Sequence, residues 1–181
     1  MNERYPDKLK ELILYVLSCP SYKEGGIKKL NKLLYFIDFY YYRDHEKLIS
    51  GAQYAKADMG PVLDKYQIIF ESLIEDNILK RQDEDGKKIY KPATHYNLSS
   101  FNPDEIDHIT KVLDKYGKLS PSELESISHD QQPWMLTENY GDIIDPDLAL
   151  LIDSGDEPES KIVENDRLKT ELEQLANSIA N

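Results

Sequence analysis

One long apolar stretch, from Ile27 to His45, places the strongest constraint on how this chain can fold. Its apolar residues recur at spacings of three and four, which is typical of one face of an α-helix: Ile27, Leu30, Leu34, Ile37 and Tyr41. Leu33, Phe36 and Tyr40 widen this face until little of the circumference is polar. A helix that is apolar over most of its surface is normally buried among other elements. We therefore predict that this segment is the central core helix.

The remaining elements are mostly helical. A Ser-Pro-Ser-Glu capping box at 120–123 and an Asn-Pro-Asp-Glu start at 102–105 are strong helix-start signals. Asp58-Met59-Gly60-Pro61 predicts a sharp turn that leads into a new helix. Periodicity and these signals predict helices at 7–18, 62–77, 103–117, 120–127 and 146–151, a short edge strand within 48–56, and a hairpin of 78–82 and 87–91. The fold class is therefore mainly α (α+β), with a small β-hairpin.

The chain divides into three parts. Residues 1–152 are long enough to form one domain with a substantial core. Residues 153–160, with the sequence DSGDEPES, form an acidic linker, and residues 161–181 form a C-terminal amphipathic helix with a narrow apolar stripe: Leu168, Leu172, Leu175 and Ile179. An isolated helix of this length is marginal in water. Two alternatives follow: the helix docks on its own domain, or it becomes ordered on a partner.

The negative charge is concentrated in one region. The net charge is −12, yet eleven acidic residues and no Lys or Arg lie between Leu119 and Ser160. Outside this region 23 acids face 22 bases, so the rest of the chain is nearly neutral. An acidic block repels nucleic acid and attracts basic partners. The alternative is a solvated surface that keeps the protein soluble.

The sequence offers no convincing catalytic or metal site. No two of the four histidines (His45, His95, His108 and His129) have the helical spacing that metal sites favour, and the common phosphate, nucleotide and nucleophile motifs are absent. We therefore expect no enzymatic activity, no cofactor and no metal. The single cysteine, Cys19, cannot form an internal disulfide. No N-terminal apolar run follows a basic start, as in a signal peptide, and no stretch reaches the length of a membrane span. These features predict a cytoplasmic protein without a membrane partner.

A DNA-binding interpretation is the main alternative. A helix followed by a basic hairpin resembles the last helix and wing of a winged-helix domain. The hairpin bases are Lys80, Arg81, Lys87, Lys88 and Lys91. The hairpin tip, Asp83-Glu84-Asp85, is nevertheless acidic where a wing would approach the phosphate backbone. A nucleic-acid partner is therefore the less favoured interpretation.

Three segments, taken in their order along the sequence, resemble one known family. They are KLNKLLYF at 29–36 with Asp38 shortly after it, ADMGPV at 57–62, and LESISHDQQPW at 124–134. Together they resemble the Panacea domain of SocA-like, phage-associated antitoxins, in which a KLLYF helix, a GPV turn and an SH…W segment recur in this order. The resemblance covers about Leu9 to Leu151 and leaves the linker and the last helix outside it.

The resemblance implies a non-enzymatic antitoxin: a compact, mainly helical domain that binds and neutralises a toxin protein encoded by the adjacent gene. Our hypothesis is steric and electrostatic masking of the toxin by a partner-binding surface near the Gly-Pro turn and the segment from His129 to Trp134. The residues expected to contribute are Tyr35, Asp38, Asp58, Met59, Gly60, Pro61, His129 and Trp134. For each of them, a purely structural role in the core or in a turn is the alternative. The toxin's identity and target and the oligomeric state of the protein stay open.

Overall fold

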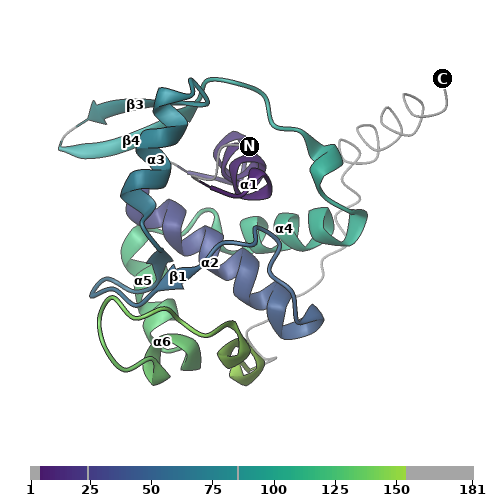
Figure 1. The fold of residues 1–181 in the computed structure, drawn as a ribbon, viewed down its shortest axis with the longest axis vertical. Helices are drawn as coiled ribbons and strands as arrows, with labels where there is room; N and C mark the ends of the chain where they lie inside the picture. The colour runs from purple at the N-terminus through teal and green to yellow at the C-terminus, as the bar shows by residue number, and fades with distance from the viewer. Residues whose placement is uncertain (1–4, 24, 85, 154–181) are drawn as a thin grey trace.

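Helix α2 (Gly26–His45) runs through the middle of the molecule (Figure 1). The computed structural model describes residues 5–23, 25–84 and 86–153. Every residue of α2 from 29 to 41 is buried, which confirms that this segment is the central core helix. The predicted linker beyond residue 153 and the predicted helix at 161–181 lie outside the described residues.

Helices from both halves of the chain pack against α2. In chain order these are α1 (Asp7–Ser18), α4 (Pro103–Tyr116), α5 (Pro121–His129) and the 3₁₀ helix η2 (Pro146–Leu151). The predicted capping box of Ser120 and Glu123 is present at the start of α5, and the predicted start of α4 is also a capping box, formed by Asn102 and Glu105. They satisfy backbone N–H groups that the first helical turn leaves unpaired. The fold is mainly α with some β, as predicted.

The chain after the Gly-Pro turn differs from the prediction. Val62–Leu63 forms the strand β2, and the next helix, α3 (Tyr66–Glu75), begins only at Tyr66. The backbone stays extended because Leu63 N–H donates to Asn31 Oδ1 (2.8 Å) and β2 pairs with β1 (Tyr54–Ala55). The predicted strand within 48–56 is reduced to β1. It is also not an edge strand, because Ala55 forms a bridge to Ile143 on its other side.

The predicted hairpin is confirmed and is longer than expected. Strands β3 (Leu79–Glu84) and β4 (Lys87–Pro92) pair in antiparallel register, with Leu79 opposite Pro92. Leu79 and Tyr90 are buried, and the Tyr90 ring packs on Phe70 of α3 with centroids 4.8 Å apart. Most other hairpin side chains are exposed, so the hairpin projects from the core beside α3 (Figure 1).

The segment after α5 forms the far end of the molecule from the hairpin (Figure 1). It contains a short helix that the sequence did not predict, α6 (Gln132–Leu136), and the predicted η2, which is capped by the side chain of Asp145. The 3₁₀ helix η1 (Leu98–Ser100) completes the elements. No helix in the described ranges is long and apolar enough to cross a membrane.

Candidate partner-binding surface

The three sequence segments that mark this chain meet at the turn of residues 57–61. The carbonyl oxygen of Ala57 accepts hydrogen bonds from Gly60 N (3.0 Å) and from Trp134 Nε1 of α6 (3.1 Å). The carbonyl oxygen of Pro61 accepts one from Lys32 Nζ of α2 (2.8 Å). The turn is thus held by α2 on one side and by α6 on the other, although these segments lie far apart in the sequence.

Glycine at position 60 is required by two independent features. Its backbone lies in the left-handed region, with φ +89°, which residues with a Cβ rarely adopt. A Cβ at this position would also lie 2.5 Å from Ser128 Oγ of α5 and 2.7 Å from Lys32 Cε. The absence of a side chain at Gly60 therefore lets the turn pack directly against α2 and α5.

Lys32 is a buried cation that the sequence analysis did not identify. Its side chain is fully buried beneath the turn. Loss of solvation lowers its pKa to about 7, and the attraction of Glu125 only partly opposes this effect. The available signal was the position of Lys32 between Leu30 and Leu33 in a helix predicted to be buried, because a buried lysine must find an acceptor inside the core.

Trp134 connects α5 and α6 with Lys56, the residue that follows β1. Its ring stacks on His129 with centroids 4.0 Å apart, and Lys56 Nζ lies 4.5 Å from the Trp134 ring centroid. The same ammonium group donates to the Thr137 carbonyl (2.7 Å). His129 and Trp134 are each half-buried.

We call Lys56 to Pro61 together with His129 and Trp134 the turn–tryptophan surface. Within it, Asp58 and Met59 are exposed at the tip of the turn, and the Met59 side chain is 54% exposed. Gly60 and Pro61 are buried and support the tip. The structure therefore brings together six of the eight residues expected to contribute.

The other two expected residues, Tyr35 and Asp38, lie in the core of the molecule and are 0% exposed. The Tyr35 ring packs on Phe39 and Tyr54, with centroids 4.4 and 5.8 Å away. Its hydroxyl has no hydrogen-bond partner among the described residues, and burial raises its pKa. Both residues therefore lie behind the surface.

Asp38 organises a buried hydrogen-bond network. Its carboxylate accepts hydrogen bonds from Ser50 N (2.8 Å), from Ser50 Oγ and from Tyr54 OH (2.7 Å). Burial raises the pKa of Asp38, although the bonds from Ser50 and Tyr54 act in the opposite direction. This network attaches the segment before β1 to α2 and so positions the strand that leads into the turn.

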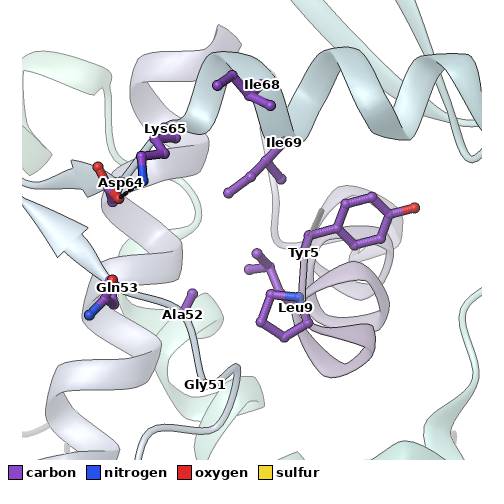
Figure 2. Close-up of a pocket in the computed structure, with 10 residues that line it drawn as sticks. Tyr5, Leu9, Gly51, Ala52, Gln53, Asp64, Lys65, Ile68 and Ile69 are labelled. Atoms are coloured by element: carbon purple, nitrogen blue, oxygen red, sulfur yellow. Dashed lines mark ion pairs between the residues drawn. The ribbon is translucent and has the colours of Figure 1, made fainter. Parts of the chain in front are cut away.

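A separate pocket of about 480 Å³ lies between the start of α1 and the start of α3 (Figure 2). Figure 2 shows Leu9 and Ile69 lining it, with Asp64 and Lys65 pairing with each other at its rim (3.6 Å). None of the eight expected site residues lines this pocket. In the described part of the chain, no group of three or more His, Cys, Asp or Glu residues is arranged to hold a metal ion.

The comparison with known families decides the family of this chain. The model for "Antitoxin SocA-like, Panacea domain" matches residues 30–135, which is more than half of the sequence. This chain belongs to the SocA-like Panacea antitoxin family. The match includes α2 from Leu30 onward, the 57–61 turn and Trp134, which are the segments that meet at the turn–tryptophan surface. No curated protein and no solved structure matches the chain.

Proposed function

We propose that this protein is an antitoxin that neutralises the toxin of a neighbouring gene by binding it directly through the turn–tryptophan surface. The observation that carries the proposal is the convergence of three family segments on one turn, which presents Asp58 and Met59 to solvent. Family membership supports an antitoxin role, and the role proposed here is binding, with no chemical step.

The energetics of the surface fit a binding role. Trp and Met are enriched in the cores of protein interfaces. Here Met59 lies on the turn, and Trp134 of α6 is hydrogen-bonded to it. A surface that is already ordered loses less conformational entropy when it binds. Five contacts of Trp134, Ala57 and Pro61 provide that order: three hydrogen bonds, one ring stack and one cation–ring contact.

The hairpin supports a DNA-binding role less well. Strand β3 does follow α3, as in a winged-helix domain, but Arg81 of β3 pairs with Glu71 of α3 (3.0 Å). Facing positions at the hairpin end combine acid and base, such as Asp83 opposite Lys88 and Glu84 opposite Lys87. The hairpin acids Asp83 and Glu84 therefore reduce the net positive charge that the hairpin offers for phosphate contacts.

Growth rescue tests the proposal. The adjacent reading frame is expressed in a heterologous bacterium with and without this protein, and the two proteins are then co-purified. We expect toxicity that co-expression relieves, together with a stable complex. Relief without a complex would contradict direct binding, and tight promoter binding that weakens steeply with salt would favour the DNA alternative.

Two variants locate the binding surface. Asp58→Lys reverses the charge at the tip of the turn, and Trp134→Ala removes the ring that supports it. We expect both to weaken neutralisation while the far-ultraviolet circular dichroism spectrum stays unchanged. Glu84→Lys, which reverses an exposed charge on the hairpin, is the matched control and should protect fully. Full protection by Asp58→Lys and Trp134→Ala would show that toxin binds elsewhere.

A further inference from the structure

A second exposed surface adjoins Trp134 and is unusually apolar. Six of the eight large apolar side chains that are strongly exposed in the described ranges come from residues 135–151, with exposed fractions of 42–63%. They are Met135, Leu136, Tyr140, Ile143, Leu150 and Leu151. Single exposed apolar residues are normal, but a concentration of them on adjoining elements marks an interaction surface. Here the elements adjoin because α6 packs against η2.

The same stretch is acidic. Exposed carboxylates alternate with the apolar side chains along it, at Glu138, Asp142, Asp145 and Asp147. No Lys or Arg occurs between residues 119 and 160. The adjacent Lys56 ammonium is already engaged with the Thr137 carbonyl and the Trp134 ring. We call the six apolar residues and these four acids the acidic apolar face.

The face is held in place by groups other than its exposed apolar side chains. Backbone hydrogen bonds join Asp142 O to Lys56 N (2.9 Å) and Tyr54 O to Ile144 N (2.8 Å). Asp147 accepts a hydrogen bond from Tyr42 OH of α2 (2.5 Å). Ile144, Ala149 and Ile152 provide the buried contacts of this stretch. Its exposed apolar groups are therefore not needed for the fold and are preorganised for a partner.

Charge decides among the possible occupants. A second copy of this chain carries the same net charge of −12, so two copies repel each other. Residues 154–181 contain seven acids and three bases, which makes the chain's own tail a poor complement to an acidic surface. Nucleic acid is also negatively charged and is therefore repelled by the acidic surface. A segment with basic residues beside an apolar stripe complements both the negative charge and the exposed apolar side chains of the face.

We infer that the acidic apolar face binds a basic amphipathic helix of the partner protein, with apolar residues seated on α6 and η2 and Lys or Arg residues against the four carboxylates. The inference rests on the proposed function to the extent that this partner is the toxin. It adds that the toxin contacts a surface continuous with Trp134 and supplies a positively charged helix to it.

The test uses the full chain and two synthetic 18-residue probes. One peptide is an amphipathic helix of Leu and Lys, and the other has Glu at every Lys position. Peptide anisotropy and the fluorescence of Trp134, the single tryptophan of the chain, report binding. We expect the Lys peptide to bind at least about tenfold more tightly than the Glu peptide, equivalent to about 1.4 kcal/mol. Equal binding of the two peptides would overturn the inference.

Matched variants then locate the peptide. Leu136→Ser and Glu138→Lys alter the face, whereas Ile68→Ser and Glu84→Lys make the same chemical changes on α3 and the hairpin. We expect the first pair to weaken Lys-peptide binding at least about tenfold and the second pair less than about twofold. Equal losses in both pairs would also overturn the inference. So would a dimer of the free protein that Leu136→Ser disperses, because it would assign the face to a second copy.

The same four variants separate this inference from the proposed function. If the wild-type chain protects cells and binds the toxin, but Leu136→Ser and Glu138→Lys do so equally well, the inference fails and direct neutralisation stands. If the neighbouring protein is harmless or never binds, the proposed function fails, while the peptide measurements still decide whether the face accepts a basic helix.

Discussion

The middle of α2 and the stretch from 135 to 151 place their side chains in opposite ways. In α2, the polar residues Asn31, Lys32 and Asp38 are buried, and each has a hydrogen-bond partner within the chain. In the later stretch, apolar residues such as Leu136 and Leu150 are half exposed. Buried polar groups must find hydrogen-bond partners inside the protein, whereas burying exposed apolar groups against a binding partner is energetically favourable. The first region therefore serves the fold, and the second is suited to binding.

The largest expected effect is at the centre of the buried network. Asp38→Ala removes the acceptor for Ser50 N, Ser50 Oγ and Tyr54 OH. Buried donors without partners are costly, so we expect a loss of about 3–5 kcal/mol in the free energy of unfolding, measured by urea denaturation. A loss below 1 kcal/mol would show that the network does not hold the strand β1 to α2.

The variant Asp38→Asn is the control, because it keeps the size of the side chain and one acceptor oxygen. Burial raises the pKa of Asp38 above 3.8 in the folded chain. The folded state therefore holds its proton to higher pH, and wild-type stability falls as the pH rises from 3.8 through the folded pKa. We expect Asp38→Asn to lose less stability than Asp38→Ala and to lack this component of the pH dependence.

Lys32 gives the second largest effect, and it depends on pH in the opposite sense. The ammonium loses its proton at about pH 7 in the folded state and near pH 10.5 in the unfolded state. Between these values the unfolded chain binds the extra proton, so stability rises with pH. We expect the wild-type chain to gain about 2–4 kcal/mol between pH 7 and 10 relative to Lys32→Met. Parallel pH profiles for the two proteins would contradict the burial of a charged Lys32.

The turn should respond strongly to a single methyl group. Gly60→Ala forces a Cβ against Ser128 and Lys32 and strains a left-handed backbone. We expect a loss of about 2–3 kcal/mol in the free energy of unfolding. Gly51→Ala is a matched control, because Gly51 also has a positive φ (69°) but no atom near its Cβ position. It should cost about 1 kcal/mol, and equal losses would contradict the close packing at Gly60.

Trp134 lies between the two regions and should give a smaller change in stability. Trp134→Phe keeps an aromatic ring beside His129 but removes the hydrogen bond from Nε1 to the Ala57 carbonyl. Gly60 N still donates to that carbonyl, so we expect a loss of only about 1 kcal/mol in thermal or urea unfolding. A loss above 3 kcal/mol would mean that Trp134 is mainly a core residue and would weaken its assignment to the binding surface.

The smallest change in stability is expected on the acidic apolar face. Leu136→Ser removes a side chain that is 53% exposed, so the free energy of unfolding should change by less than about 0.5 kcal/mol. Its effect on partner binding should nevertheless be large. For Gly51→Ala we expect the reverse, a larger effect on stability than on partner binding. A destabilised Leu136→Ser chain with unchanged binding would remove the contrast between the two regions.

Much of the fold could be predicted from periodicity and helix-start signals. The apolar pattern of Ile27 to His45 identified the core helix, and the Asn102 and Ser120 caps located α4 and α5. These signals act within one or two helical turns, so they are visible in a short stretch of sequence. The path after Pro61 could not be predicted, because Leu63 is held extended by Asn31, a residue 32 positions earlier.

The candidate site shows the same limit. The sequence identified Asp58, Met59 and Trp134 through their resemblance to family segments, and the structure places them on one surface. It did not show that Tyr35 and Asp38 are buried, because the polar side of a nearly apolar helix can face either solvent or buried partners. It also did not reveal the acidic apolar face, since exposure of Leu136 and Leu150 depends on how α6 and η2 pack together.

Hydrogen exchange on the toxin complex tests the contrast between the two regions most directly. Amide exchange is measured by mass spectrometry on the full chain, alone and bound to the product of the adjacent gene. We expect new protection at 56–61 and 129–152, no change in the already protected middle of α2, and no change in the hairpin at 79–92. Protection confined to the hairpin, or its absence at both expected segments in a stable complex, would contradict the account.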